Sequence, residues 1–379
     1  MEISEIRNRI EPIDDELLKL FLERMDLIEE VTNYKRENHM PINDFARERE
    51  ILSRITKDAG DREMYVHHFF TNLFQLSKAR QREMISSPSN LRSIIEQALE
   101  NGGDIFPKSG TVACQGMEGS NSQVAAEKMI PRGNVTHVKS FDAVFEAVDS
   151  GLCKYGVLPI ENSSNGSVRG VYELLQSHQC YIIGSTKLFI RHELLAKPGT
   201  KMEDIRAIYS HEQAIGQCSR FLNKLGDQVT VIPCSNTAVA AKKVAESEDP
   251  HIAAIASHGC TEIYGLKTVC KTIQNSDNNY TRFICISKEP RIFAGANRIS
   301  LVINCNNKPG ALYDILSKLA IMDINMNKLE SCPVIGSDFE FSFFLDIDAS
   351  VKEPGLISLL EELERICAQF AFLGNYTEV

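Results

Sequence analysis

The sequence predicts a multidomain chain that combines an all-α region over residues 1–87, an α/β region over 108–288 and an α+β module over 297–379. Three observations predict this division. Apolar residues recur at helical spacing in the first region, short apolar runs alternate with helical patterns in the second, and the third has the order βαββαβ. A chain of 379 residues has room for two or three domains with cores of their own.

The first region is predicted to form three helices. Pro41 ends the first helical stretch, the second begins near Asp44, and the third runs from about Met64 to Ile85. Pro12 lies inside the first helix, where its missing N–H should kink the axis. The apolar positions at helical spacing are Ile3, Ile6, Ile10, Ile13, Leu17, Leu20, Leu27 and Val31. Three helices make a thin core, so we expect two copies to dimerise with their long helices antiparallel.

The α/β region follows a linker at residues 86–90 and a short helical segment. Its alternating pattern predicts a mostly parallel sheet, with ligand sites at the carboxyl ends of the strands. The stretch from Leu158 to Val168 fits such a site, because a carboxylate, two amides and three hydroxyls follow an apolar run. Asn, Ser and Gly are also ordinary turn residues, so this stretch alone is equally compatible with a simple turn.

The C-terminal module is predicted from six consecutive elements. Residues 298–304, 324–329, 339–347 and 371–376 are expected as strands, and residues 311–321 and 353–370 as helices. Pro309 and Gly310 lie at the turn into the first helix, where free backbone N–H groups can hold an anion. A module of this size attached to a larger protein is often a regulator.

Composition restricts the class of protein. The net charge of −10 argues against nucleic acid as a partner, and an anionic substrate would need a local cluster of Arg and Lys. Eleven Cys without a CxxC pair predict buried thiols in a reducing cytosol, and neither disulfides nor a zinc site. The N-terminus lacks the order of a signal peptide, and no apolar run approaches membrane-spanning length. We therefore expect a soluble cytoplasmic protein with no membrane partner.

Several polar residues of the helical region share helix faces. They are Arg24 with Lys35, Asp44 with Glu48, Ser77 with Gln81, and Arg47 beside Glu48. Arg7 lies seventeen residues before Arg24 and points about 100° away on a straight helix, so it is better placed to serve a partner chain. A solvated face with salt bridges would explain any one of these residues.

In this order and spacing, these eight residues resemble those of the all-helical chorismate mutases, and residues 7–14 share the pattern Arg-x-x-Ile-x-x-Ile-Asp. Chorismate rearranges to prephenate without a covalent catalyst, so the protein must fold the substrate and stabilise charge at the breaking C–O bond. The resemblance implies a role for each residue. The two carboxylates are held by Arg24, Lys35 and Arg7 of a partner chain, and the ether oxygen accepts hydrogen bonds from Lys35 and Gln81. The ring hydroxyl donates to Glu48 and Asp44, with Arg47 and Ser77 in support.

Five motifs of the α/β region resemble those of the prephenate dehydratases, in family order. They are residues 115–122, Pro159-Ile-Glu-Asn-Ser163 with Gly166-Ser-Val168, Ser210-His-Glu-Gln-Ala214 with Gln217-Cys218, Ser235-Asn-Thr-Ala238 and Tyr280-Thr-Arg-Phe283. Each motif alone has an ordinary explanation as a turn, a loop histidine or a strand. The resemblance implies two α/β lobes, like those of periplasmic binding proteins, with the site between them.

The implied reaction removes the ring carboxylate of prephenate as CO2 and its para hydroxyl as water, giving phenylpyruvate, and requires no metal or organic cofactor. Departure of hydroxide calls for a proton donor or strong hydrogen bonds. The family points to Thr281 as the residue most tied to catalysis, while Glu161, if protonated, is chemically the better acid. Candidate ligands are Asn162, Ser163, Ser210 and Gln217, and Arg282 is expected to pair with a substrate carboxylate or a neighbouring acid.

In the C-terminal module, Gly310-Ala-Leu312 and Glu330-Ser-Cys-Pro333 resemble the ACT domain that senses phenylalanine. The resemblance implies that the backbone at Gly310 holds the effector carboxylate. It also implies that Ala311 and Leu312 cover the effector ring and that Glu330 and Ser331 complete the site. Cys332 stands where the family usually has Arg, and a helix cap and a strand end would also explain the two motifs.

Over nearly its full length the chain resembles the bifunctional chorismate mutase/prephenate dehydratases, which implies a dimer or tetramer regulated by L-phenylalanine. Two other functions remain open. Arogenate could replace prephenate in the second site, giving phenylalanine directly. Alternatively, the lobes could form an amino-acid sensor without catalysis, although the presence of Thr281 and Glu161 argues against a sensor.

Overall fold

The structure is a computed structural model that describes residues 2–85, 89–305, 310–333 and 341–379. The chain divides into two compact units, Met1–Asn90 and Leu91–Val379. Among the described residues, no helix has both the length and the apolar character needed to cross a membrane.

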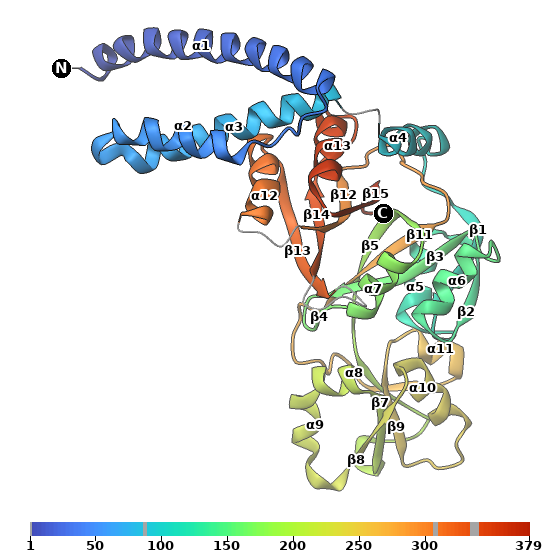
Figure 1. The fold of residues 1–379 in the computed structure, drawn as a ribbon. Helices are drawn as coiled ribbons and strands as arrows, with labels where there is room; N and C mark the ends of the chain where they lie inside the picture. The colour runs from blue at the N-terminus through green and yellow to red at the C-terminus, as the bar shows by residue number, and fades with distance from the viewer. Residues whose placement is uncertain (1, 86–88, 306–309, 334–340) are drawn as a thin grey trace. The chain divides into compact units, whose positions relative to one another are not determined.

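The first unit, called the helical unit, consists of α1 (Ile3–Glu37), α2 (Phe45–Lys57), the short η1 (Gly60–Arg62) and α3 (Glu63–Ile85). These are the three helices that the sequence predicts. α2 begins after Asp44 because the carboxylate of Asp44 accepts a hydrogen bond from the backbone N–H of Arg47 and caps the helix. α1 continues through Pro12 without interruption, and Figure 1 draws it as one ribbon that curves along its length.

The apolar face of α1 is left uncovered within one chain. Thr32 is the only buried residue among those described in this helix, and the predicted apolar positions, from Ile3 to Val31, are all exposed. A helix normally becomes stable by burying such a face against another element. The helical unit therefore presents a long apolar surface that lacks a cover in the single chain.

The second unit begins with an α/β lobe, called the first lobe. Its sheet has the order β2 (Arg132–Val138), β1 (Ser109–Gln115), β3 (Tyr155–Asn162), β11 (Tyr280–Ser287) and β5 (Tyr181–Phe189), with β4 (Gly166–Ser167) attached to β3. Helix α5 (Asn121–Met129) packs on one face of this sheet, and α6 (Phe141–Asp149) and α7 (Arg169–Ser177) pack on the other.

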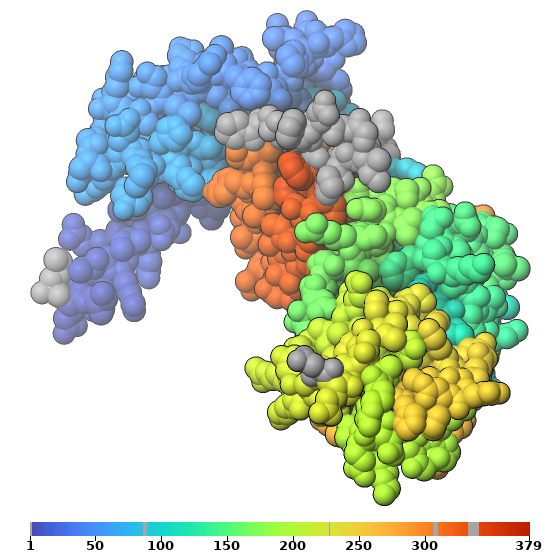
Figure 2. All heavy atoms as spheres, turned by 90° about the horizontal axis from the view of Figure 1, so that it is seen from below, coloured from blue at the N-terminus to red at the C-terminus, as the bar shows by residue number. Residues whose placement is uncertain are grey.

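The second lobe has its own sheet, in the order β10 (Lys267–Cys270), β6 (Glu193–Ala196), β9 (Ile252–Ala256), β7 (Ala207–His211) and β8 (Thr230–Cys234). Its helices are α8 (Glu212–Gln217), α9 (Ser219–Leu225), α10 (Thr237–Glu246) and α11 (Cys260–Tyr264), with short turns η2 (Met202–Asp204) and η3 (Gly226–Gln228). The chain enters this lobe after β5 and leaves it before β11. Figure 2 shows the second lobe, in yellow-green and yellow, as a distinct mass beside the green first lobe.

The two sheets correct the expectation of a mostly parallel arrangement. β1 runs parallel to β2 and β3, and β7 runs parallel to β8 and β9, but every pair that involves β11, β6 or β10 is antiparallel. The antiparallel strands include those next to the crossings between the lobes. Helices α8 and α9 follow each other directly and are separated at Cys218.

The C-terminal module has the predicted βαββαβ order. It comprises β12 (Arg298–Asn304), α12 (Ala311–Ile321), β13 (Asn325–Pro333), β14 (Phe341–Asp348), α13 (Leu356–Ile366) and β15 (Gln369–Tyr376), and its antiparallel sheet has the order β13-β14-β12-β15. Pro309, predicted at the first turn, lies outside the described residues. The short helix after the linker, α4 (Asn90–Asn101), contributes Leu91, Ile95 and Ala98 to the core of this module.

The C-terminal module shares a core with the first lobe. Phe344 and Tyr376, from one face of the module's sheet, pack in the same apolar cluster as Leu158, Ile160 and other residues of the first lobe. The tail adds to the edge of the first lobe's sheet, since Ser185 N–H donates to Thr377 O at 3.0 Å and Val379 N–H donates to Ser185 O at 2.7 Å. The module is thus packed directly against the strands of the first lobe.

Candidate active sites

In the helical unit, three predicted residues meet on α1 and α3. Arg24 Nη1 donates to Ser77 Oγ at 2.5 Å, and the Arg24 guanidinium lies 5.8 Å from the centre of the Phe74 ring. Burial lowers the pKa of Arg24, because desolvation disfavours its charged form. Gln81 lies one turn after Ser77 and is buried, and its Oε1 has no hydrogen-bond partner among the described residues. These groups form a polar patch between α1 and α3.

A lysine that the sequence analysis missed joins this patch. Lys78 is buried, and its Nζ lies 3.2 Å from each carboxylate oxygen of Glu48, so it connects α3 with α2. A buried lysine is costly unless it is paired, and Glu48 provides that pair. The signal was weak, because Lys78 follows Ser77 in a helix rich in ordinary charged residues.

Other predicted residues of the helical unit are engaged locally. Lys35 Nζ donates to the carbonyl of Ile42 at 2.7 Å, and Asp44 caps α2. Arg47 is 58% exposed and pairs with Glu50 at 2.7 Å. Arg7 is exposed, and it lies seventeen residues from Arg24, or about 25 Å along a helix that rises 1.5 Å per residue. Arg7 therefore cannot reach the Arg24 patch of its own chain.

A cleft of about 590 Å³ lies between the first and second lobes. All five predicted motifs of the α/β region contribute to its wall, including Gln115, Asn162, Gln217, Asn236 and Thr281. These residues are spread over more than 160 positions of the sequence, from Gln115 to Thr281, and the topology of the two lobes brings them together.

Helix N-termini give the cleft its positive character. The first residues of α5, α7 and α10 line it, and each such terminus carries the equivalent of roughly half a positive charge together with free N–H groups. Among the described residues that line the cleft, Arg169 is the only Arg or Lys, and none is Asp or Glu. The expected local cluster of Arg and Lys is thus replaced here by backbone dipoles and one arginine.

Asn162 and Thr281 form the central pair of the cleft. They lie opposite each other on β3 and β11, and Asn162 Nδ2 donates to Thr281 Oγ1 at 2.9 Å. Asn162 Oδ1 accepts from the backbone N–H groups of Ser164 and Asn165, which fixes the amide orientation. Because Oγ1 already accepts one hydrogen bond, the hydroxyl proton of Thr281 remains available to a ligand.

A chain of hydrogen bonds continues from this pair into the second lobe. Asn162 Nδ2 also donates to Asn279 Oδ1 at 2.9 Å, and Asn279 Nδ2 donates to Gln217 Oε1 at 3.0 Å. His192 Nε2 reaches the same oxygen at 2.8 Å, so the neutral ring donates there. Burial lowers the pKa of His192, although the hydrogen bond with Gln217 opposes that change.

Asn279 and His192 were not predicted as site residues. Asn279 lies two positions before Thr281, and His192 lies between two apolar runs at the crossing between the lobes. Both are buried polar side chains, but burial is not visible in a single sequence. Their place in one polar chain with Gln217 follows only from the three-dimensional arrangement.

Glu161 and Arg282 are not part of the cleft wall. The pairing of β3 and β11 shifts register between Arg282 and Phe283, and this β-bulge leaves Ile160 without an opposite residue. Pro159 and Asn162 therefore face the cleft, while Glu161 and Arg282 face the C-terminal module. The expectation that Glu161 acts as an acid in the cleft is contradicted by this geometry, and so is a direct contact of Arg282 with substrate.

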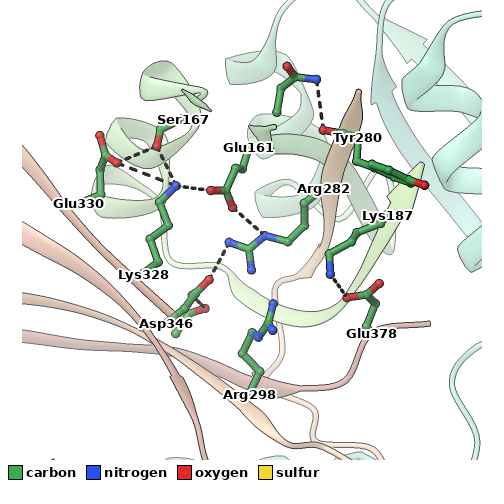
Figure 3. A network of polar contacts seen from close by, with 12 residues as sticks. Glu161, Ser167, Lys187, Tyr280, Arg282, Arg298, Lys328, Glu330, Asp346 and Glu378 are labelled. Atoms are coloured by element: carbon green, nitrogen blue, oxygen red, sulfur yellow. Dashed lines mark hydrogen bonds and ion pairs between the residues drawn. The ribbon is translucent and has the colours of Figure 1, made fainter. Parts of the chain in front are cut away.

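Arg282 instead forms ion pairs with two neighbouring acidic residues. Its Nη2 lies 2.6 Å from Asp346 on β14, and its Nε lies 3.4 Å from Glu161 (Figure 3). Burial alone would lower the pKa of Arg282, but the attraction of Asp346 and the other nearby acidic groups outweighs it and raises the pKa. The guanidinium therefore stays charged inside the protein.

Two predicted serine ligands have structural roles. Ser163 Oγ donates to Asn278 O at 2.7 Å and accepts from Tyr280 N–H at 2.9 Å, so it ties the strand ends together. Ser210 is fully buried and donates to Ile255 O at 2.7 Å, which joins β7 to β9. Neither serine lines the cleft among the residues described there, and this corrects their assignment as substrate ligands.

The predicted effector residues lie at two places in the C-terminal module. Gly310 has φ +84° and immediately precedes α12, which begins with Ala311 and Leu312. A positive φ suits glycine, because other residues are strained there. Glu330 lies on β13 next to Ser331, and its Oε2 accepts from Ser167 Oγ at 2.7 Å. Cys332, where the family usually has Arg, is buried in the core shared with the first lobe.

All eleven cysteines are free thiols. Among the described residues, no group of three or more His, Cys, Asp or Glu is placed to hold a metal ion.

Comparison with known proteins identifies two families, one for each unit of the chain. The chorismate mutase type II family matches residues 6–82, and the prephenate dehydratase family matches residues 112–291. The bifunctional chorismate mutase/prephenate dehydratase of Escherichia coli K12 is 32% identical over 377 residues, which cover 98% of this chain and 95% of that protein. Arogenate dehydratase/prephenate dehydratase 2 of Arabidopsis thaliana is 38% identical over 277 residues, which cover 70% of this chain and 72% of that protein.

A solved structure supports the same assignment for the second unit. Prephenate dehydratase from Arthrobacter aurescens in complex with L-Phe superimposes with a TM-score of 0.66 at 26% identity, covering 71% of this chain and 90% of that one. The chain belongs to the family of bifunctional chorismate mutase/prephenate dehydratases.

Proposed function

We propose that the chain catalyses two consecutive reactions at two separate sites, with chorismate rearranged in the helical unit and prephenate converted to phenylpyruvate in the cleft between the lobes. The observation that carries the second assignment is the convergence of all five dehydratase motifs on one cleft. The first assignment rests on the patch of Arg24, Ser77 and Gln81 beside the Lys78–Glu48 pair.

In the helical unit the reaction is an intramolecular rearrangement, so catalysis consists of holding a folded conformer and stabilising charge on the ether oxygen. Arg24 and Lys35 bind carboxylates of the substrate. The Gln81 side chain donates its amide to the ether oxygen, and its buried position makes that hydrogen bond stronger than it would be in water. Lys78 holds the carboxylate of Glu48, which accepts from the ring hydroxyl.

The helical unit works as a dimer. The apolar face of α1 is exposed in one chain, and Arg7 lies about 25 Å from the Arg24 patch. An antiparallel pairing of two α1 helices would bury both apolar faces and bring Arg7 of the partner subunit to the site. A second copy is the occupant that fits, because the surface that needs covering and the missing cation lie on the same helix.

In the cleft, the electron pair of the bond to the departing CO2 flows into the ring and expels hydroxide from the para position, so the ring becomes aromatic. Thr281 donates its hydroxyl proton in a hydrogen bond to the leaving oxygen, while Asn162 holds Oγ1 from the other side. Phe141, Pro159 and Phe283 supply apolar wall, which favours loss of charge from the carboxylate as CO2 forms.

The charge of the cleft favours prephenate over arogenate. Prephenate carries two carboxylates, which suit the helix N-termini and Arg169. Arogenate carries an ammonium group, and the described residues of the wall include no Asp or Glu to pair with it. We therefore place arogenate second as a substrate.

The C-terminal module is an ACT domain that binds L-phenylalanine and reduces dehydratase turnover. Its βαββαβ order supports this assignment, and the relative from Arthrobacter aurescens is described in complex with L-Phe. The left-handed Gly310 at the start of α12 exposes backbone N–H groups for the effector carboxylate, with Leu312 near its ring. Glu330 lies on the face of β13 toward the first lobe, where binding can be sensed, and its neighbour Ser331 is exposed.

The test is to give chorismate to the full chain and to follow prephenate and phenylpyruvate with and without phenylalanine. Parent protein should form phenylpyruvate, Thr281→Ala should stop at prephenate, and Lys35→Ala should leave chorismate unchanged while still consuming added prephenate. Thr281→Ser serves as the matched control because it keeps the hydroxyl. Formation of phenylpyruvate by Thr281→Ala at the parent rate would refute the role of Thr281, and faster turnover of arogenate than of prephenate would overturn the choice of substrate.

A further inference from the structure

The catalytic face of the cleft has a charged pair directly behind it. Asn162 and Thr281 are opposite each other in the register of β3 and β11, and the next opposite pair is Glu161 and Arg282. The first pair faces the cleft and the second faces the C-terminal module. A displacement of Arg282 or Glu161 therefore moves the adjacent residues, Thr281 and Asn162, which face the cleft.

Arg282 is held by the C-terminal module. It is 5% exposed, and its partner Asp346 is 1% exposed at a distance of 2.6 Å. Asp346 also accepts from Ser300 Oγ at 2.5 Å, and this hydroxyl is 2.7 Å from Tyr376 Oη. Nε and Nη1 of Arg282 have no hydrogen-bond partner among the described residues. The direction of the guanidinium is thus set chiefly by one carboxylate of the module.

A second contact holds the other strand. Lys328 Nζ on β13 lies 3.0 Å from Glu161 Oε1 and donates to Ser167 Oγ at 2.7 Å, and Glu330 accepts from the same hydroxyl (Figure 3). Ser167 also belongs to the cleft wall. The module therefore contacts β3, β4 and β11, behind the cleft at Glu161 and Arg282 and at the cleft wall itself at Ser167.

We infer that Asp346 and Lys328 of the C-terminal module are positioning residues for dehydration, because they hold Arg282 and Glu161 and thereby fix Thr281 and Asn162 in the cleft. This inference rests on the proposed role of Thr281. It makes the module a structural part of the dehydratase site even when no effector is bound. A change at Asp346 then alters turnover more than substrate affinity, because Asp346 contacts Arg282 behind β11 and not the helix N-termini that bind carboxylates.

A purely structural role for the ion pair has to be separated from positioning, since breaking any buried pair destabilises a protein. The chain offers a matched control in Glu361 on α13. It is 6% exposed and binds Arg92 of α4 through two hydrogen bonds of 3.0 Å. This pair belongs to the same module but touches neither β3 nor β11, so its loss should lower stability without moving Thr281.

The experiment compares Asp346→Asn with Glu361→Gln in the full chain, using prephenate as the probe. A displacement of reacting groups on the ångström scale lowers turnover by about 10- to 100-fold, and we expect a loss of this size in kcat for Asp346→Asn, with KM close to that of the parent. Glu361→Gln should keep the parent kcat even if its unfolding temperature falls as far as that of Asp346→Asn. Each dehydratase rate is divided by the folded fraction of the protein and compared with the mutase rate of the same preparation.

Two further variants keep the inference testable if Asp346→Asn folds poorly. Lys328→Gln removes the second contact and should lower kcat in the same direction, whereas Arg282→Lys keeps the charge and should retain more activity than Arg282→Gln. Parent-like kcat in folded Asp346→Asn, or in folded Lys328→Gln where the first does not fold, would overturn the inference, as would an equal loss in Glu361→Gln. If Thr281→Ala itself leaves dehydration intact, the proposed function fails and not merely the positioning.

Discussion

The helical unit and the cleft between the lobes assemble their sites in opposite ways. In the helical unit, Arg24, Ser77 and Gln81 come together because helical periodicity places them on facing sides of α1 and α3. Arg7 and most of the apolar face of α1 are nevertheless exposed among the described residues of that unit. In the cleft, the described wall comes from both lobes of one chain. Strand register and a bulge set which residues face it, and the C-terminal module contacts the strands behind it.

This difference teaches where each activity should be vulnerable. In the proposed dimer the mutase site takes Arg7 from a second copy of the chain, so its weak point is an intermolecular contact that dilution or a change on α1 can remove. The dehydratase site depends on contacts inside one chain, so its weak points are buried polar groups. Each activity therefore reports on a separate set of interactions in the same molecule.

The largest effect is expected from exchanging subunits between two inactive mutases. Arg7→Ala and Lys35→Ala should each lose mutase activity by about 100- to 1000-fold, the usual effect of removing one charge-stabilising donor. In a mixed dimer, one site carries both changes and the other carries neither. Random exchange should therefore restore about one quarter of the parent activity, since half of the dimers are mixed and half of their sites are intact.

Dehydratase activity in the same mixtures is the internal control and should stay at the parent level throughout. Subunit exchange is verified with chains that carry two different affinity tags. If the mixed species is isolated and remains without mutase activity, Arg7 does not act across the interface.

The same contrast explains what the sequence could and could not predict. The three helices of the first unit and the i,i+4 pair Ser77–Gln81 were predicted correctly, because helical periodicity is local. Glu161 was expected as an acid in the cleft because of its motif and its chemistry, but the structure places it behind the cleft wall, although simple alternation from Pro159 would put it in the cleft. The bulge at Ile160 shifts that alternation, and a bulge depends on the partner strand, which lies more than a hundred residues away.

Long-range contacts also account for the other errors. Ser210 belongs to a recognised motif, but its hydroxyl is used to join β7 to β9. Asn279 and His192 carry the polar chain across the lobes, yet they show no local pattern that separates them from ordinary loop residues. The five dehydratase motifs were predicted as a set, and their meeting in one cleft depends on a topology that single motifs do not encode.

The next largest effect should come from Asn162→Ala, which removes the donor to Thr281 Oγ1 and the contact with Asn279. Dehydratase kcat should fall by about 100-fold, because Thr281 loses the group that orients its hydroxyl. The matched control is Ser163→Ala on the neighbouring position, which bonds only to backbone atoms among the described residues. It should lower stability and leave kcat near that of the parent, and an equal loss in both variants would contradict the assignment.

A smaller effect is expected from Glu161→Gln. This variant distinguishes a Glu161 that acts as an acid in the cleft from a Glu161 that supports the wall from behind. Glutamine cannot donate an acidic proton but still accepts a hydrogen bond from Lys328. We expect kcat to fall by no more than about 10-fold, with the pH profile of dehydration unchanged in shape, because no proton transfer is lost. If one limb of the pH profile disappears in Glu161→Gln, Glu161 is the acid, and its placement behind the cleft wall is wrong.

The smallest effect concerns stability and pH at His192. Burial lowers its pKa in the folded chain, while an unfolded histidine titrates near 6.5, so the unfolded state binds more protons below that pH. The free energy of unfolding should therefore decrease as the pH falls below about 6.5, with a slope of at most about 1.4 kcal/mol per pH unit from this residue.

Replacing His192 with Gln should remove this slope, because the amide can donate to Gln217 but does not titrate. Thermal unfolding of the parent and of His192→Gln between about pH 5 and 8 gives the comparison, and the exposed His137→Gln is the control that should follow the parent. A parallel pH dependence in the parent and His192→Gln would mean that His192 is free to take up a proton in the folded protein. The polar chain between the lobes would then accommodate a charge at its hydrogen bond with Gln217.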